Sequence, residues 1–143
     1  MKQKIYDEIK NIVIKNNWNY IENIKELGIE KMLAISVTTD NGQWVLVIRA
    51  IEEENRLICY SVLPVEISED KRFEAMEAIT KINYGLKLGN FEIDLGSGEI
   101  HFKTGIQFPE DFEGNIESWI EDNIALNVAT MDKYYNELTA ISN

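Results

Sequence analysis

Residues 83–103 constrain the fold more strongly than any other part of the chain. This stretch combines a helix end, a corner that contains Gly85 and Gly89, and two alternating apolar–polar segments that flank Ser97 and Gly98. Glycine at such a corner is typical of a helix end, and a period of two is typical of strands with one buried face. The sequence therefore predicts a helix followed by a tight antiparallel hairpin.

The alternation also predicts a register for this hairpin. An even-numbered loop around Ser97 and Gly98 keeps apolar side chains on one face and charged side chains on the other. The predicted opposite pairs are Ile93 with Phe102, Leu95 with Ile100, Asp94 with His101, and Glu92 with Lys103. A shift by one residue would place carboxylates against apolar side chains, so the pattern specifies which side chains share a face.

Three segments with apolar residues at helical spacing predict helices. They are residues 3–16, residues 68–86 with Ser68 as the N-cap, and a long segment that follows Pro109 and begins near residues 113–115. In the middle helix, the residues expected on one buried face are Phe73, Met76, Ile79, Ile82 and Leu86.

Further strands are predicted over residues 33–38, 44–48 and 56–65. Residues 44–48 are apolar at every position, which predicts a central strand that is covered on both faces. Residues 18–24, which connect the first helix to these strands, have a less regular apolar pattern that is compatible with one more short strand. The element order is α-β-β-β-α-β-β-α, which indicates an α+β fold with an antiparallel sheet of about five strands packed by helices.

The length of 143 residues and an apolar content of 45% are typical of one folded domain, which we expect to span residues 1–143. The single cysteine, Cys59, cannot form an internal disulfide, and its apolar setting favours a buried, inert thiol. The charged first residues do not resemble a signal peptide, and no run approaches the ~18 apolar residues of a membrane span. We therefore expect a cytoplasmic protein.

The chain has 25 acidic and 14 basic side chains and a net charge of −11. This charge repels phosphate backbones and anionic lipid surfaces, so we expect neither nucleic acid nor a membrane as a partner. Two interpretations of the acidity stay open. It keeps the protein in solution, or it attracts a basic segment of a partner protein.

The hairpin region resembles the signature of YbjN-type bacterial domains, on residues 83–94 and 98–104. Residues 127–134 are similar to the last helix of that family, and Trp18, residues 42–44 and residues 60–61 also fit. The resemblance covers nearly the whole chain. It implies the fold of type III secretion chaperones, which are small, acidic, usually dimeric proteins that bind extended client segments. It implies no enzymatic activity and no shared catalytic residues.

Five residues are candidates for partner binding: Trp18, Trp44, Trp119, Asn123 and Asn127. Each tryptophan fills the core or, if partly exposed, marks a binding groove, because aromatic anchors are common at interfaces. The asparagines lie on the apolar stripe of the last helix. A buried amide must bond to nearby groups, or it sets the register of a helix-pairing seam.

The sequence offers no catalytic or metal-binding motif, and we expect no enzyme and no cofactor. Gly85 and Gly89 follow a helix, whereas a phosphate loop follows a strand. Asp94 and His101 form the nearest approach to a polar site, and we interpret them as a cross-strand ion pair rather than a metal or acid–base site.

We therefore expect a non-catalytic protein that binds a polypeptide partner, chaperone-like or regulatory, and that forms a homodimer. One alternative is a dedicated immunity or adaptor protein for a single target. Another is a small-molecule sensor, which would need a deep pocket with convergent polar groups.

Overall fold

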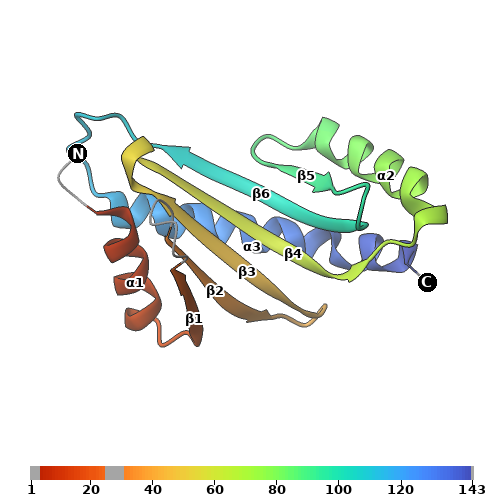
Figure 1. Ribbon diagram of the computed structural model, residues 1–143, viewed down its shortest axis with the longest axis horizontal. Coiled ribbons are helices and arrows are strands. Elements are labelled where there is room, and N and C mark those ends of the chain that lie inside the picture. Colours follow the sequence, from red (N-terminus) through yellow and green to blue (C-terminus); the bar gives the residue numbers. More distant parts are fainter. Residues whose placement is uncertain (1–3, 25–30, 143) are drawn as a thin grey trace.

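The computed structural model describes residues 4–24 and 31–142, which form a six-stranded antiparallel sheet with helices packed on it. The strands lie in the order β1-β2-β3-β4-β6-β5 (Figure 1). Their bounds are β1 Tyr20–Ile24, β2 Lys31–Thr38, β3 Gln43–Ile51, β4 Arg56–Glu66, β5 Asn90–Ile93 and β6 Glu99–Gln107. The predicted α+β class is confirmed. The sheet has one strand more than expected because the segment over residues 18–24 contains β1.

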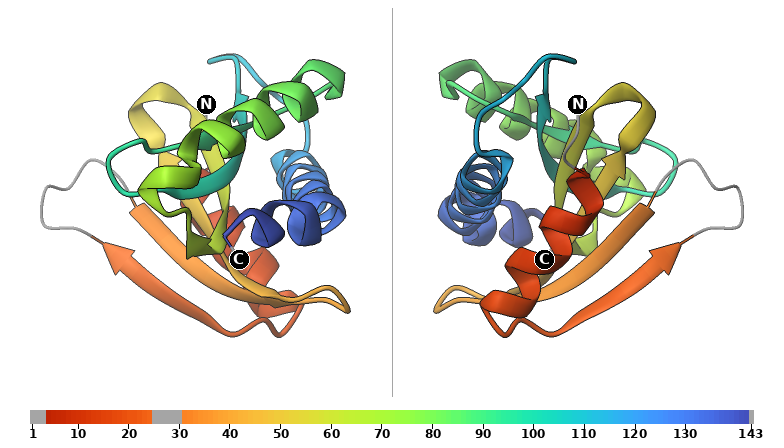
Figure 2. Two further views of the ribbon diagram at one scale, coloured as in Figure 1. Left: turned by 90° about the vertical axis from the view of Figure 1, so that its right-hand side faces the viewer. Right: turned by 90° about the vertical axis from the view of Figure 1, so that its left-hand side faces the viewer.

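Three helices pack on one face of the sheet (Figure 2). They are α1 Ile5–Lys15, α2 Arg72–Gly85 and α3 Ile116–Ile141, and two short 3-10 turns are η1 Glu52–Glu54 and η2 Glu69–Lys71. The helix α3 contacts β4 and β6, α1 lies against α3 and β3, and α2 packs on β5 and α3. In the described part of the chain, no helix lies on the other face of the sheet, which faces the viewer in Figure 1.

The two outer predicted helices form where the apolar spacing places them. In α1, the side chains of Ile5, Ile9 and Ile12 are fully buried, and residue 3 of the predicted helix lies outside the described residues. The helix α3 begins after Asn115, whose Oδ1 accepts a hydrogen bond from the N–H of Glu117 at 3.0 Å. Its 26 residues give a rod of about 39 Å that runs the length of the sheet.

The strand β3 is central in the sheet, but only one of its faces is covered. Leu46 and Ile48 point toward the helices and are buried, whereas Val45 is 45% exposed and Val47 is half-buried on the other face. The expectation that residues 44–48 are covered on both faces is therefore wrong. The apolar residues of the second face are left at the surface.

The β5–β6 hairpin keeps the predicted faces but not the predicted partners. Phe91 lies opposite Phe102, and Glu92 lies opposite His101. Each partner differs by two residues from the expected pairing, which is why the apolar and charged faces are preserved.

The turn of the hairpin explains this difference. Asp94 donates its N–H to the carbonyl of Glu99 at 2.9 Å, and Gly98 donates to the carbonyl of Asp94 at 2.7 Å. The turn therefore begins earlier than expected and takes Asp94 and Leu95 out of the sheet. The predicted pairs of Asp94 with His101 and of Leu95 with Ile100 are wrong.

The helix α2 buries a narrower stripe than the sequence predicts. Ala75 and Ile79 are buried, and Ile82 packs partly against the same core, but Phe73 is 84% exposed. Phe73 lies two residues before Ala75, about 200° around the helix axis. Its predicted place on the buried face is wrong.

We expect Gly98→Ala to lower the free energy of unfolding by about 2–3 kcal/mol. Gly98 has a φ of +83°, and a Cβ at this position would collide with the backbone of Ile67. The matched control is Gly85→Ala at the end of α2, where a Cβ would meet no atom within 4 Å. This control should be neutral or stabilise the protein by about 0.5 kcal/mol in urea denaturation. Equal effects of the two substitutions would contradict this account of the turn.

Candidate binding surfaces

A buried chain of hydrogen bonds joins α3 to the sheet. The indole Nε1 of Trp44 donates to Ser61 Oγ at 3.0 Å, and Ser61 Oγ donates to Asn127 Oδ1 at 2.6 Å. Asn127 Nδ2 donates to Thr104 Oγ1 at 3.0 Å, and Thr104 Oγ1 donates to Asn123 Oδ1 at 2.8 Å. Three of the five candidate residues therefore belong to one internal network.

Two of these candidates do not reach the surface of the described chain. Trp44 is 2% exposed and Asn127 is fully buried. Asn127 Nδ2 also lies 3.1 Å from the carbonyl oxygens of Cys59 and Phe102, so its amide faces the sheet and not another helix. Trp18, Trp119 and Asn123 are left as candidates that a partner can contact.

The uncovered face of the sheet carries an apolar surface, called the open face below, which Arg49 interrupts between Met32 and Ile58. Its apolar residues come from four neighbouring strands and are Ile21, Met32, Ala34, Val45, Val47, Ile58, Tyr60 and Val62. Val45 lies directly opposite Val62, and Val47 lies between Ala34 and Tyr60. Ile21 and Val45 are exposed and the other six are half-buried, and contiguous apolar surfaces of this kind mark interaction sites.

Charged residues of β5 and β6 border the open face. His101 Nε2 lies 2.8 Å from Glu92 Oε1, and Lys103 Nζ lies 3.0 Å from Glu92 Oε2. Burial raises the pKa of Glu92, but the hydrogen bonds from His101 and Lys103 outweigh this effect and hold the pKa below its ordinary value. Glu92, and not Asp94, is thus the carboxylate that pairs with His101.

A shallow hollow of about 520 Å³ lies where the apolar and charged parts of the open face meet. Arg49 Nη1 donates to the hydroxyl of Tyr60 at 2.8 Å, and the rings of Tyr60 and His101 meet edge to face at 4.9 Å. These contacts fix polar groups beside Val47 and Val62. The hollow combines apolar area with orienting polar groups, as interfaces between proteins do.

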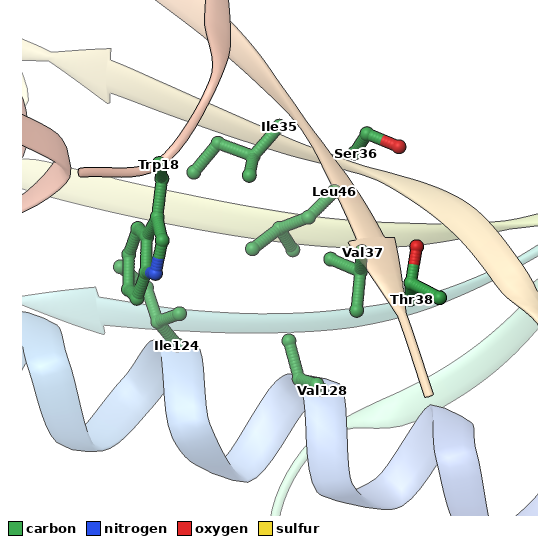
Figure 3. Close-up of a pocket in the computed structure, with 8 residues that line it drawn as sticks. All are labelled: Trp18, Ile35, Ser36, Val37, Thr38, Leu46, Ile124 and Val128. Carbon is green, nitrogen blue, oxygen red and sulfur yellow. The ribbon is translucent and has the colours of Figure 1, made fainter. Parts of the chain in front are cut away.

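A second surface is the apolar pocket beside Trp18, on the helix side of the sheet (Figure 3). The pocket measures about 310 Å³, and Ile35, Leu46, Ile124 and Val128 contribute to its wall. The indole ring of Trp18 stands at one end and is 37% exposed. The polar residues of the lining, Ser36 and Thr38, are exposed rather than buried, so the pocket offers mainly apolar contact.

The third surface is a groove of about 450 Å³ between α3 and the outer edge of β6, called the Trp119 groove below. Its lining residues are Leu88, Gly89, Thr104, Gly105, Ile106, Gln107, Trp119, Asp122, Asn123 and Leu126. Trp119 is 55% exposed, and its ring meets Phe112 edge to face at 6.1 Å. The candidates Trp119 and Asn123 are brought together here, whereas Trp18 lies at a different pocket.

The thiol of Cys59, which the sequence predicts to be inert, is buried. Cys59 has no exposed area, and burial raises the pKa of its thiol to about 12, against a smaller opposing effect of its hydrogen bond with Thr104. The thiol is therefore protonated at neutral pH, as predicted. Across residues 4–24 and 31–142, no three His, Cys, Asp or Glu side chains gather as metal ligands would.

Comparison with known proteins adds no relative. No family model, no curated protein and no solved structure matches the chain. The resemblance to YbjN-type domains stays a prediction. Within the described residues, no helix has both the length and the apolar character needed to cross a membrane.

Sequence reasoning missed the open face. Its signal was present in residues 44–48, which are apolar on both faces, but full burial was the more usual interpretation. It also missed Leu88, which is 65% exposed at the Trp119 groove, because an apolar residue in a loop carries no periodic pattern.

We expect Asn127→Leu to lower the free energy of unfolding by about 2–4 kcal/mol, because the hydroxyls of Ser61 and Thr104 lose buried partners. The control is Asn136→Leu, which removes an exposed amide from the same helix, where it bonds to Asn41. This control should cost no more than about 0.5 kcal/mol. Denaturant titration measures both, and equal losses would show that the buried network does not hold α3.

Proposed function

We propose that this protein is a non-catalytic, polypeptide-binding protein, chaperone-like or regulatory. The observation that carries the proposal is the open face, where apolar side chains from four neighbouring strands lie at the surface. On a monomeric protein, a contiguous apolar surface of this kind marks an interaction site. A second polypeptide would bury this area and gain the hydrophobic contribution that the helices provide on the other face.

The charge distribution supports a partner with basic residues. The net charge is −11, and Glu99 borders the apolar part of the open face beside Glu92, whose own charge is paired with His101 and Lys103. Complementary charge at the border of an interface raises the association rate and disfavours wrong partners. A client segment with apolar residues flanked by lysine or arginine fits this surface.

A small-molecule sensor has weaker support. The Trp18 pocket is large enough for a small ligand, but its buried lining consists of apolar side chains. Small-molecule sites orient their ligands with a few convergent polar groups. The same open face would serve a dedicated adaptor for a single target, and the number of partners captured distinguishes such an adaptor from a general chaperone.

The test is capture of partners from cell lysate, followed by titration of the strongest partner with purified protein. We expect micromolar binding and a loss of at least about tenfold in affinity for Val47→Glu, which places a carboxylate in the centre of the apolar surface. The control Ala129→Glu adds the same charge at an exposed position of α3. The proposal fails if no polypeptide binds at micromolar concentration, or if both variants bind like the original protein.

We further propose that the protein forms a homodimer through α2. Phe73 and Tyr84 are 84% and 95% exposed, and they lie eleven residues apart, which places them on one side of the helix. Exposed aromatic residues are enriched at interfaces between proteins. The second copy would cover these two rings.

Sedimentation equilibrium measures the dimer directly. We expect a mass of twice 16.5 kDa for the original chain and of 16.5 kDa for the double variant Phe73→Ser, Tyr84→Ser. The control Leu95→Ser removes an exposed apolar side chain from the hairpin turn and should leave the dimer intact. A mass of 16.5 kDa for the original chain at every concentration would rule out the dimer.

A further inference from the structure

The strand β6 extends beyond its outer neighbour. β5 pairs with residues 100–103 of β6, whereas β6 continues to Gln107. On the other side, β4 pairs with β6 as far as Gln107. In the described part of the chain, residues 104–107 therefore have a strand on one side only.

Some backbone N–H and C=O groups of residues 104–107 point away from β4, toward the side where another strand could pair. Phe108 donates its N–H to the carbonyl of Asn55, which directly precedes β4, and the carbonyl of Glu99 accepts from the N–H of Asp94 on the side of β5. Because hydrogen-bonding directions alternate along a strand, the odd-numbered residues of β6 point to the outer side. The N–H and C=O groups of Gly105 and Gln107 thus face the open edge.

Gly89 explains why β5 stops short. Its φ is +76°, a conformation that turns the chain away from β6 just before β5 begins. A Cβ on Gly89 would collide with the side chains of Phe102 and Thr104, so glycine is required for this close approach. The turn leaves the outer edge of residues 104–107 beside the Trp119 groove.

Both sides of this edge can receive side chains. On the helix side, the Trp119 groove offers Leu88, Ile106 and Trp119 as apolar contacts. On the other side, a hollow of about 260 Å³ includes Ile58 and Gly105 in its lining, and Gly105 has no side chain to fill it. A strand added to the edge would place alternate side chains in the groove and in the hollow.

The charge of the groove indicates which partner fits. Asp122 lines the groove and is exposed, and the whole chain carries a net charge of −11. A lysine or arginine of a partner segment would be attracted to the exposed carboxylate of Asp122. The groove therefore favours an extended segment with apolar residues on one side and basic residues beside them.

We propose that an extended segment of a partner protein binds by adding a strand to residues 104–107 of β6. Its main chain bonds to Gly105 and Gln107, an apolar side chain enters the Trp119 groove, and a basic side chain pairs with Asp122. Strand addition is a common mode of peptide recognition in which the main chain supplies affinity and the pockets supply specificity. The proposal rests on the proposed polypeptide-binding function and assigns it a second surface, which adjoins the open face at Ile58.

The probe is a synthetic peptide, Lys-Thr-Val-Thr-Val-Thr-Lys, with both ends blocked. Its valines and lysines project to one side and its threonines to the other. We expect saturable binding and slower amide hydrogen exchange at Gly105 and Gln107, measured by NMR on the full chain. Methylation of the two valine amides or of the three threonine amides should abolish binding in one case and spare it in the other, because alternate amides face β6.

Two variants test the site in the protein. We expect Asp122→Lys to weaken peptide binding at least about fivefold more than Glu137→Lys, which makes the same charge change at another exposed position of α3. Equal effects of these two variants would overturn the proposal. So would peptide binding that does not slow exchange at Gly105 and Gln107, or no peptide binding at millimolar concentration.

Two further outcomes separate this proposal from others. If Val47→Glu abolishes peptide binding and Asp122→Lys does not, the open face is the binding surface and the groove is not. If the amides of Gly105 and Gln107 exchange slowly without peptide and become fast on dilution, a second copy of the chain occupies the edge. That result overturns the assignment to another protein. Failure of the peptide leaves the capture experiment to decide the proposed function.

Discussion

The bonds of Asn127 to the sheet position α3, and the two helix-side surfaces depend on that position. The amide is fully buried and bonds to groups of β4 and β6, so α3 cannot slide or rotate without leaving buried polar groups unpaired. With this register fixed, Trp119 and Asn123 face the outer edge of β6, and Ile124 and Val128 face the Trp18 pocket. The buried amide of Asn127 therefore determines which side chains of α3 line the Trp119 groove and which line the Trp18 pocket.

The arrangement of all described helices on one face has a direct physical consequence for function. The helix side of the sheet is filled by side chains of α1, α2 and α3, and the other side keeps its apolar residues at the surface (Figure 2). Val47 and Tyr60 lie on that surface opposite one another. The distribution is the one expected of a sheet that uses one face for its core and the other for contact.

The sequence predicts what depends on local pattern and misses what depends on tertiary packing. The helix with Ile5 and Ile9 follows from its apolar spacing, and so does the last helix with its start near residues 113–115. The hairpin register does not, because the turn hydrogen bonds of Asp94 decide it. Likewise, the apolar spacing places Trp119 on the last helix but does not predict that it is exposed. That exposure depends on tertiary structure, because the Trp119 groove lies beside the part of β6 that β5 leaves unpaired.

The central claim is that the open face is a contact surface for another polypeptide. Hydroxyl-radical footprinting of the protein, free and bound to its captured partner, tests this claim most directly, because Met32 and Tyr60 are reactive side chains on that face. The account predicts that oxidation of both falls in the complex. Unchanged oxidation of Met32 and Tyr60, with protection confined to residues elsewhere, would contradict it.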